Sequence, residues 1–143
     1  MARSTNTVLI HRPVEDVFAF FTTPGNDRRW RTHVISISAD GPVAVGSRIS
    51  QSVAGPGGRT IPADIEVTGC EPYSRYSFTV VAGPVRPSGD FRFSAEGDHT
   101  RVEFTLSAEL SGVKKLLMGG AVQRSMDAEV AALVEAKRIL EAA

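Results

Sequence analysis

The chain passes from an expected strand into a short helix through the stretch Ile10-His11-Arg12-Pro13-Val14-Glu15-Asp16-Val17-Phe18. Pro13 suits the first turn of a helix, because the N–H that proline lacks would have no partner there. Glu15 and Asp16 then place negative charge at the positive end of the helix dipole. The stretch therefore predicts a strand over residues 5–11 and a helix over residues 12–21.

A second short helix is expected from Thr23 to about Arg29, with Trp30 directly after it. Beyond it, apolar and polar residues alternate with a period of two, which is typical of antiparallel strands with one covered face. Turns rich in glycine and proline separate these segments. The pattern predicts strands at residues 34–39, 47–53, 61–68, 75–81, 90–95 and 100–110.

The last thirty or so residues return to a helical period, with one apolar stripe that runs from Val113 through Leu116 and Leu117 to Leu140. Gly119 and Gly120 interrupt it, and a glycine weakens a helix by roughly 1 kcal/mol relative to alanine. We expect a kink at this pair and a main helix from residue 121 to the end. The order is then β-α-α-β6-α, an α+β arrangement in which one helix covers one sheet.

Length and charge narrow the classes of protein. With 143 residues the chain is expected to form a single domain over 1–143. Sixteen basic and sixteen acidic residues cancel, so no overall field attracts nucleic acid. No apolar stretch approaches the roughly 20 residues that span a bilayer, and no signal peptide is visible. We expect a soluble, cytoplasmic protein that does not bind nucleic acid and has no integral membrane association.

Cysteine and histidine are too sparse for a familiar metal or redox site. Cys70 is the one cysteine, so neither an internal disulfide nor a CxxC metal site can form. His11, His33 and His99 are scattered without HxH or HExxH spacing. We expect no metal site and no cofactor.

Four motifs in order resemble one superfamily. They are the 10–18 stretch followed by Pro24 and Trp30, then Val45-Gly46-Ser47, then residues 65–72, then residues 97–102. Together they resemble the START/Bet v1-like (SRPBCC) superfamily, and within it the polyketide cyclase/dehydrase-like branch, over nearly the whole chain. The resemblance implies a helix-grip (Bet v1-like) fold, in which a curved seven-stranded antiparallel sheet surrounds the long C-terminal helix. It also implies a cavity for a hydrophobic ligand, and a homodimer is a possible assembly.

Inward-facing apolar residues are the candidates for the cavity wall, since ligand pockets are mostly apolar with few polar anchors. For each of them, ordinary core packing is the alternative. The candidate ligand-binding residues are Trp30, Gln51, Ile65, Phe78, Phe91, Phe93, Phe104, Met118, Val122 and Met126.

Three polar residues are candidates for chemistry. His33 can act as a general acid or base near neutral pH, with a half-exposed loop histidine as the alternative. The Tyr76 phenol can donate a hydrogen bond to an enolate, or merely sit at a cavity rim. The Gln51 amide can orient a ligand carbonyl, or face water at a sheet edge. Arg31 and Glu129 are expected at a solvated helix end and in surface ion pairs.

These features favour a cofactor-free cyclase or dehydratase that acts on a polyketide-like or aromatic metabolite. A non-catalytic carrier of a lipid or hydrophobic metabolite is the alternative, because the residues do not separate catalysis from binding. An interaction module of the Hsp90-activator type has no supporting motif.

Overall fold

The computed structural model describes residues 1–143 except for the side chain of Pro56. Its first half contains β1 (Ala2–Ile10), α1 (Val14–Phe21), the 3-10 turn η1 (Pro24–Asn26), α2 (Asp27–Trp30), β2 (Val34–Ala39), β3 (Arg48–Ala54) and the 3-10 turn η2 (Pro56–Gly58). The second half contains β4 (Thr60–Pro62), β5 (Ile65–Glu71), β6 (Arg75–Val80), β7 (Ser88–Glu96), β8 (His99–Ala108), α3 (Gly112–Ala131) and α4 (Leu133–Ala142).

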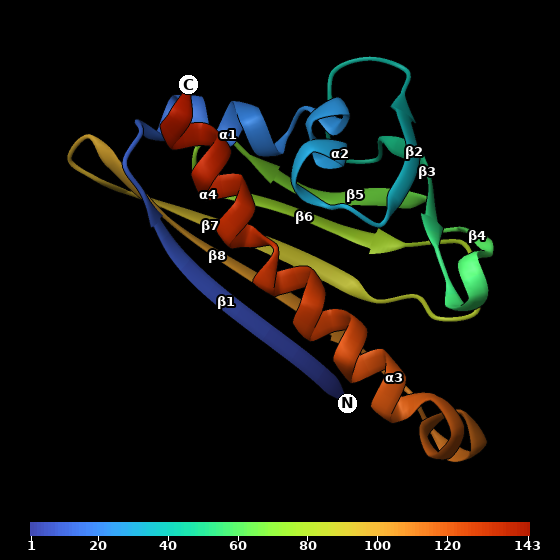
Figure 1. Ribbon diagram of the computed structural model, residues 1–143. Coiled ribbons are helices and arrows are strands. Elements are labelled where there is room, and N and C mark those ends of the chain that lie inside the picture. Colours follow the sequence, from blue (N-terminus) through green and yellow to red (C-terminus); the bar gives the residue numbers. More distant parts are fainter.

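One antiparallel sheet curls around the C-terminal helices (Figure 1). Over the described chain its strand order is β1-β8-β7-β6-β5-β3-β2, and β4 pairs with β3 beside this path. The α1 and α2 helices lie at the same end of the molecule as α4 (Figure 1). This arrangement confirms the predicted helix-grip fold with its curved seven-stranded sheet and long C-terminal helix.

The strand expected at 61–68 is divided in two. Pro62 cannot donate a hydrogen bond to a ladder, and β4 ends there. Asp64 instead accepts a hydrogen bond from the Gln51 backbone N–H, at 3.1 Å, and its own C=O accepts one from the Val81 N–H at 2.7 Å. The prediction of one strand was wrong because these contacts replace the regular ladder at residues 63 and 64.

The kink expected at Gly119–Gly120 was also placed wrongly. The α3 helix continues through both glycines and ends at Ala131, one residue before a break at Ala132. Met118 packs against the core and Val122 is buried, so packing on both sides of the pair outweighs the low helix propensity of glycine. At the break the Ala132 N–H is shared between the carbonyls of Ala128 and Glu129. The break lets α3 and α4 both follow the curled β1 strand.

The apolar stripe at the start of α3 does not join the core. Val113, Leu116 and Leu117 are exposed, at 69%, 84% and 75%. The buried stripe starts later, at Val122, and continues through Met126 and Val130. A single stripe from residue 113 onward was therefore the wrong interpretation, and α3 has two apolar faces.

Aromatic side chains fill the core where α1 and α2 meet the sheet. The rings of Phe91 and Phe104 stack with centroids 4.1 Å apart. Phe21 of α1 and Trp30 of α2 meet edge to face at 5.6 Å, and Trp30 also contacts Phe104. Such pairs each add roughly 0.5–1.5 kcal/mol beyond burial, so this end of the fold is well packed.

Two glycines predict opposite responses to alanine. A Cβ at Gly119 would find no atom closer than the Lys115 Cγ at 3.9 Å, whereas one at Gly89 would lie 2.3 Å from the Phe78 Cζ. We expect Gly119→Ala to raise the free energy of unfolding by about 0.5–1 kcal/mol. We expect Gly89→Ala to lower it by about 1–3 kcal/mol through overpacking. Urea unfolding measures both, and a loss of stability in Gly119→Ala would contradict the continuous helix.

Candidate functional site

A cavity of about 330 Å³ lies between the sheet and α3. Most of its wall is apolar, and both the sheet and α3 contribute. The main apolar lining residues are Val53, Ile61, Phe78, Val80, Leu106, Met118, Val122 and Met126. The polar lining residues are Arg31, His33, Gln51, Ser125 and Glu129.

Glu129 of α3 joins two cavity residues that come from the segment after α2. Its Oε2 lies 2.7 Å from the His33 Nε2, and its Oε1 accepts a hydrogen bond from the Arg31 Nε. The side chains of Arg31 and Glu129 are each only 12% exposed, while that of His33 is 39% exposed. One carboxylate therefore holds a buried guanidinium and a more open imidazole at the cavity wall.

The short α2 helix fixes the position of Arg31. Its backbone N–H donates to the Asp27 C=O at 2.8 Å, and its Nη1 donates to the Asp27 Oδ2 at 3.0 Å. The same Nη1 lies 3.3 Å from the Gln51 Oε1. His33 is tied to β3 because its C=O accepts the Ala54 N–H at 2.8 Å.

Burial and neighbouring charges act in opposite directions on the pKa values of Glu129 and Arg31. Burial acts to raise the pKa of Glu129, but the charge of Arg31 and the hydrogen bond from His33 outweigh it and hold that pKa below its ordinary value. Burial acts to lower the pKa of Arg31, and the charges of Glu129 and Asp27 outweigh it and raise that pKa. Glu129 and Arg31 therefore remain an ion pair around neutral pH.

Asp27 is the member of the cluster whose ionised form is least stable. Burial raises its pKa to about 6, and Arg31 offsets only part of this effect. Within the described chain the buried indole N–H of Trp30 has no hydrogen-bond partner of normal geometry. The attraction between this N–H and the Asp27 carboxylate is one of the smaller effects that lower the pKa of Asp27. Keeping the Asp27 carboxylate ionised beside Arg31 therefore costs free energy of folding.

The geometry suits His33 to proton transfer. Because Glu129 stays ionised, the proton between the two groups lies on the His33 Nε2, and a neutral imidazole then has its lone pair on Nδ1. A carboxylate that orients a histidine in this way is a recurring arrangement in general base catalysis. Arg31 uses Nε and Nη1 in its hydrogen bonds, and no hydrogen bond from its Nη2 is found among the described residues.

The predicted site residues divide into two groups. The cavity lining includes His33, Gln51, Phe78, Met118, Val122 and Met126. The others lie in the buried core, outside this lining: Trp30, Ile65, Tyr76, Phe91, Phe93 and Phe104. Tyr76 stacks on Phe91, and burial raises its pKa well above the ordinary value of a phenol, so it stays protonated.

Arg31 and Glu129 were expected in solvated positions, and the structure buries both. Arg31 follows the buried Trp30, and Asp27 makes the cluster larger still. The sequence spacing could have indicated that Glu129 is not solvated, since it lies three residues after Met126 and shares the same helix face. A carboxylate on a buried apolar stripe requires a cationic partner.

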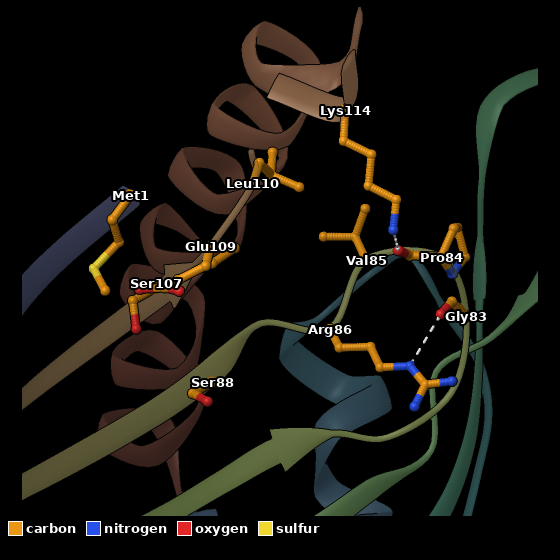
Figure 2. A pocket seen from close by; sticks show the side chains of 11 residues that line it. Met1, Gly83, Pro84, Val85, Arg86, Ser88, Ser107, Glu109, Leu110 and Lys114 are labelled. Atoms are coloured by element: carbon orange, nitrogen blue, oxygen red, sulfur yellow. Dashed lines mark hydrogen bonds between the residues drawn. The ribbon is translucent and has the colours of Figure 1, made fainter. Parts of the chain in front are cut away.

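A second pocket, of about 590 Å³, shares Gly83, Pro84 and Val85 with the cavity lining. Figure 2 shows it between the 83–86 loop and the start of α3, where the Lys114 Nζ donates to the Pro84 C=O and the Arg86 Nε to the Gly83 C=O. It has no buried charged cluster like that of the cavity, which is the better candidate site.

Neither a metal-binding cluster nor a membrane-spanning helix is present among the described residues. No cluster of three or more His, Cys, Asp or Glu side chains there is arranged to hold a metal ion. No helix there is both long and apolar enough to cross a membrane.

A curled antiparallel sheet around a long C-terminal helix, with a cavity between them, defines the helix-grip class. Residues 1–137 match the family described as polyketide cyclase / dehydrase and lipid transport, and the chain belongs to that family. No curated protein matches the sequence.

Solved structures agree with this fold. Protein TTHA0849 from Thermus thermophilus is similar at 21% identity and a TM-score of 0.80, over 98% of this chain and 97% of that one. A START superfamily protein from Mycobacterium smegmatis is 14% identical with a TM-score of 0.79, over 99% and 98% of the two chains. Norcoclaurine synthase from Thalictrum is 10% identical with a TM-score of 0.72, over 97% and 92%.

The raised pKa of Asp27 predicts a pH-dependent stability. The folded state holds this proton more tightly than the unfolded chain, whose aspartates titrate near pH 3.9, so stability is lost as the pH rises from about 4 to about 6. Asp27→Asn cannot ionise. We expect its unfolding free energy, relative to the unsubstituted chain, to increase on the order of 2–3 kcal/mol between pH 4 and pH 7. Urea unfolding at both pH values measures this, and a difference that does not change with pH would contradict it.

Proposed function

We propose that residues 1–143 form one cytoplasmic domain that binds a hydrophobic small molecule in the cavity and promotes its cyclisation or dehydration. The observation that carries the proposal is the His33–Glu129–Arg31 cluster at the wall of an otherwise apolar cavity. A volume of about 330 Å³ lies at the lower end of the range for ligand pockets. It favours a one- or two-ring aromatic or a short polyketide-like chain.

The proposed reaction begins with enolisation. The His33 Nδ1 removes a proton from the carbon next to a ligand carbonyl; the electrons of the C–H bond form a C=C bond, and the π electrons of the C=O bond move to the oxygen. The Arg31 Nη2 donates a hydrogen bond to the resulting enolate. The enolate carbon then attacks a second carbonyl of the same molecule, and the new alkoxide takes the proton back from His33. Atoms and charge balance without a co-reactant.

The apolar wall contributes by shaping the ligand. Holding two reactive carbons in contact converts a slow encounter into an intramolecular step, which can account for a large part of a rate enhancement. Phe78 from the sheet and Met126 from α3 are both in the wall, so the ligand would be folded between the sheet and the helix. Gln51, only 6% exposed, would orient a second carbonyl.

A carrier without catalysis is the second candidate function. The family description includes lipid transport, and most of the cavity wall is apolar. Binding and proton transfer must therefore be tested separately.

Binding is tested by filling the cavity. Ala63 lines it and is partly buried, whereas Ala95 is exposed on β7. We expect the apolar fluorophore N-phenyl-1-naphthylamine to bind the unsubstituted protein saturably, and Ala63→Trp to weaken binding at least tenfold because the indole occupies the cavity. Ala95→Trp is the matched control and should bind as the unsubstituted protein does. Equal affinity in all three proteins would contradict a ligand in this cavity.

Proton transfer is tested with the aryl ketone 2-acetonaphthone in D₂O. We expect the protein to accelerate exchange of the methyl protons, followed by NMR, and His33→Gln to reduce this acceleration at least tenfold, since a general base contributes roughly 10²–10⁴-fold. His99→Gln changes an exposed histidine far from the cavity and is the control. Saturable binding of the ketone without acceleration of exchange would reject the enzyme and favour the carrier.

A further inference from the structure

The start of α3 carries an apolar surface that the rest of the described chain does not cover. Val113, Leu116 and Leu117, which we call the α3 tip, are between 69% and 84% exposed. Figure 1 shows this part of α3 extending beyond the end of the sheet. Exposed leucines scattered singly are ordinary, but three apolar side chains at positions i, i+3 and i+4 form one continuous stripe.

The α3 tip points away from the cavity. At about 100° per residue, Val113, Leu116 and Leu117 are centred roughly opposite the buried stripe of Val122 and Met126. Along the tip stripe, Gly120 comes next, and the Arg124 guanidinium lies over it, with Nη1 3.4 Å from the position of a Cβ. The stripe is therefore a separate surface, apolar at its start and cationic at its end.

Basic residues surround the tip. Lys114 and Lys115 belong to the same turns, and Arg86 lies in the facing loop, across the pocket in Figure 2. Glu109 is the acidic residue of this pocket. In the part of the chain that the structure describes, none of Lys114, Lys115, Arg124 and Arg86 takes part in an ion pair. Four cations against two carboxylates, Glu109 and the exposed Asp127 beyond Arg124, leave this end positive although the whole chain is neutral.

We propose that the α3 tip docks on the surface of an anionic lipid bilayer. Val113, Leu116 and Leu117 enter the boundary between headgroups and acyl chains, where an apolar helix face is stable. Lys114, at the edge of the stripe, extends its ammonium group to the lipid headgroups, and the negative surface attracts Lys115, Arg124 and Arg86 at longer range. A second copy of this chain fits less well, because a symmetric contact would bring the four cations of each copy together.

Docking in this way would hold one end of the cavity close to the bound segment of α3. Met118 follows the tip directly and lines the cavity, as do Ala121 and Val122 in the next turn. The 83–85 loop lines both the cavity and the tip pocket. The docking proposal itself does not require His33 to be catalytic.

The test uses flotation with unilamellar vesicles of phosphatidylcholine alone or with about 30% phosphatidylserine. We expect the protein to bind the phosphatidylserine vesicles at least tenfold more tightly at 50 mM than at 500 mM NaCl, since salt screens the headgroup charge. Leu116→Ser/Leu117→Ser should reduce this binding at least tenfold. Ile35→Ser/Val134→Ser removes two exposed apolar residues elsewhere and should bind normally.

The charge contribution has its own variant pair. Lys114→Glu/Lys115→Glu should abolish the preference for phosphatidylserine, whereas Arg28→Glu, at an exposed residue of α2, should leave it nearly unchanged. Circular dichroism and thermal unfolding check that each variant is folded. Failure of the unsubstituted protein to float with either vesicle, or equal binding by all variants, overturns the proposal. A dimer in light scattering that Leu116→Ser/Leu117→Ser converts to monomer, without vesicle binding, assigns the tip to self-association and overturns it as well.

Discussion

The ion pair between Arg31 and Glu129 joins the two halves of this fold. These residues lie 98 positions apart, and their contact ties the segment after α2 to the helix that covers the sheet. Both side chains are nearly buried, so removing Arg31 would leave the carboxylates of Glu129 and Asp27 without their shared guanidinium partner, which typically costs several kcal/mol. This contact ties α3 to the cavity wall and orients His33 through Glu129, whereas the raised pKa of Asp27 comes mainly from burial.

The interior of the fold has two regions that differ in how tightly their side chains pack. On the α1 side, stacked and edge-to-face rings pack against one another, and six of the predicted ligand-binding and catalytic residues lie in the core outside the cavity lining. On the other side, aliphatic and methionine side chains line a cavity. In this chain the aromatic core stabilises one end of the fold, while a cavity remains at the other. Methionine suits the open side, since its flexible side chain adapts to irregular space.

Local patterns predicted the fold well, because alternation and helical spacing report directly which face of an element is covered. They predicted Gln51, Phe78 and Met126 at the cavity for the same reason. They placed the helix break at Gly119 rather than Ala132, because packing on the curled sheet decides where a helix bends and residue preference is only a weak influence. The partnership of Arg31 with Glu129 could not be predicted from either residue alone, since it depends on how distant segments meet.

The contact between Phe78 and Gly89 has a consequence for which molecules the cavity admits. These residues face one another across β6 and β7, and the Phe78 ring lies over the bare backbone of Gly89 while also forming part of the cavity wall. The missing side chain at position 89 thus lets the ring sit low against the sheet. A larger residue there would push the ring inward and narrow the chamber, so the width of the cavity depends in part on a side chain that is absent from a residue outside the cavity lining.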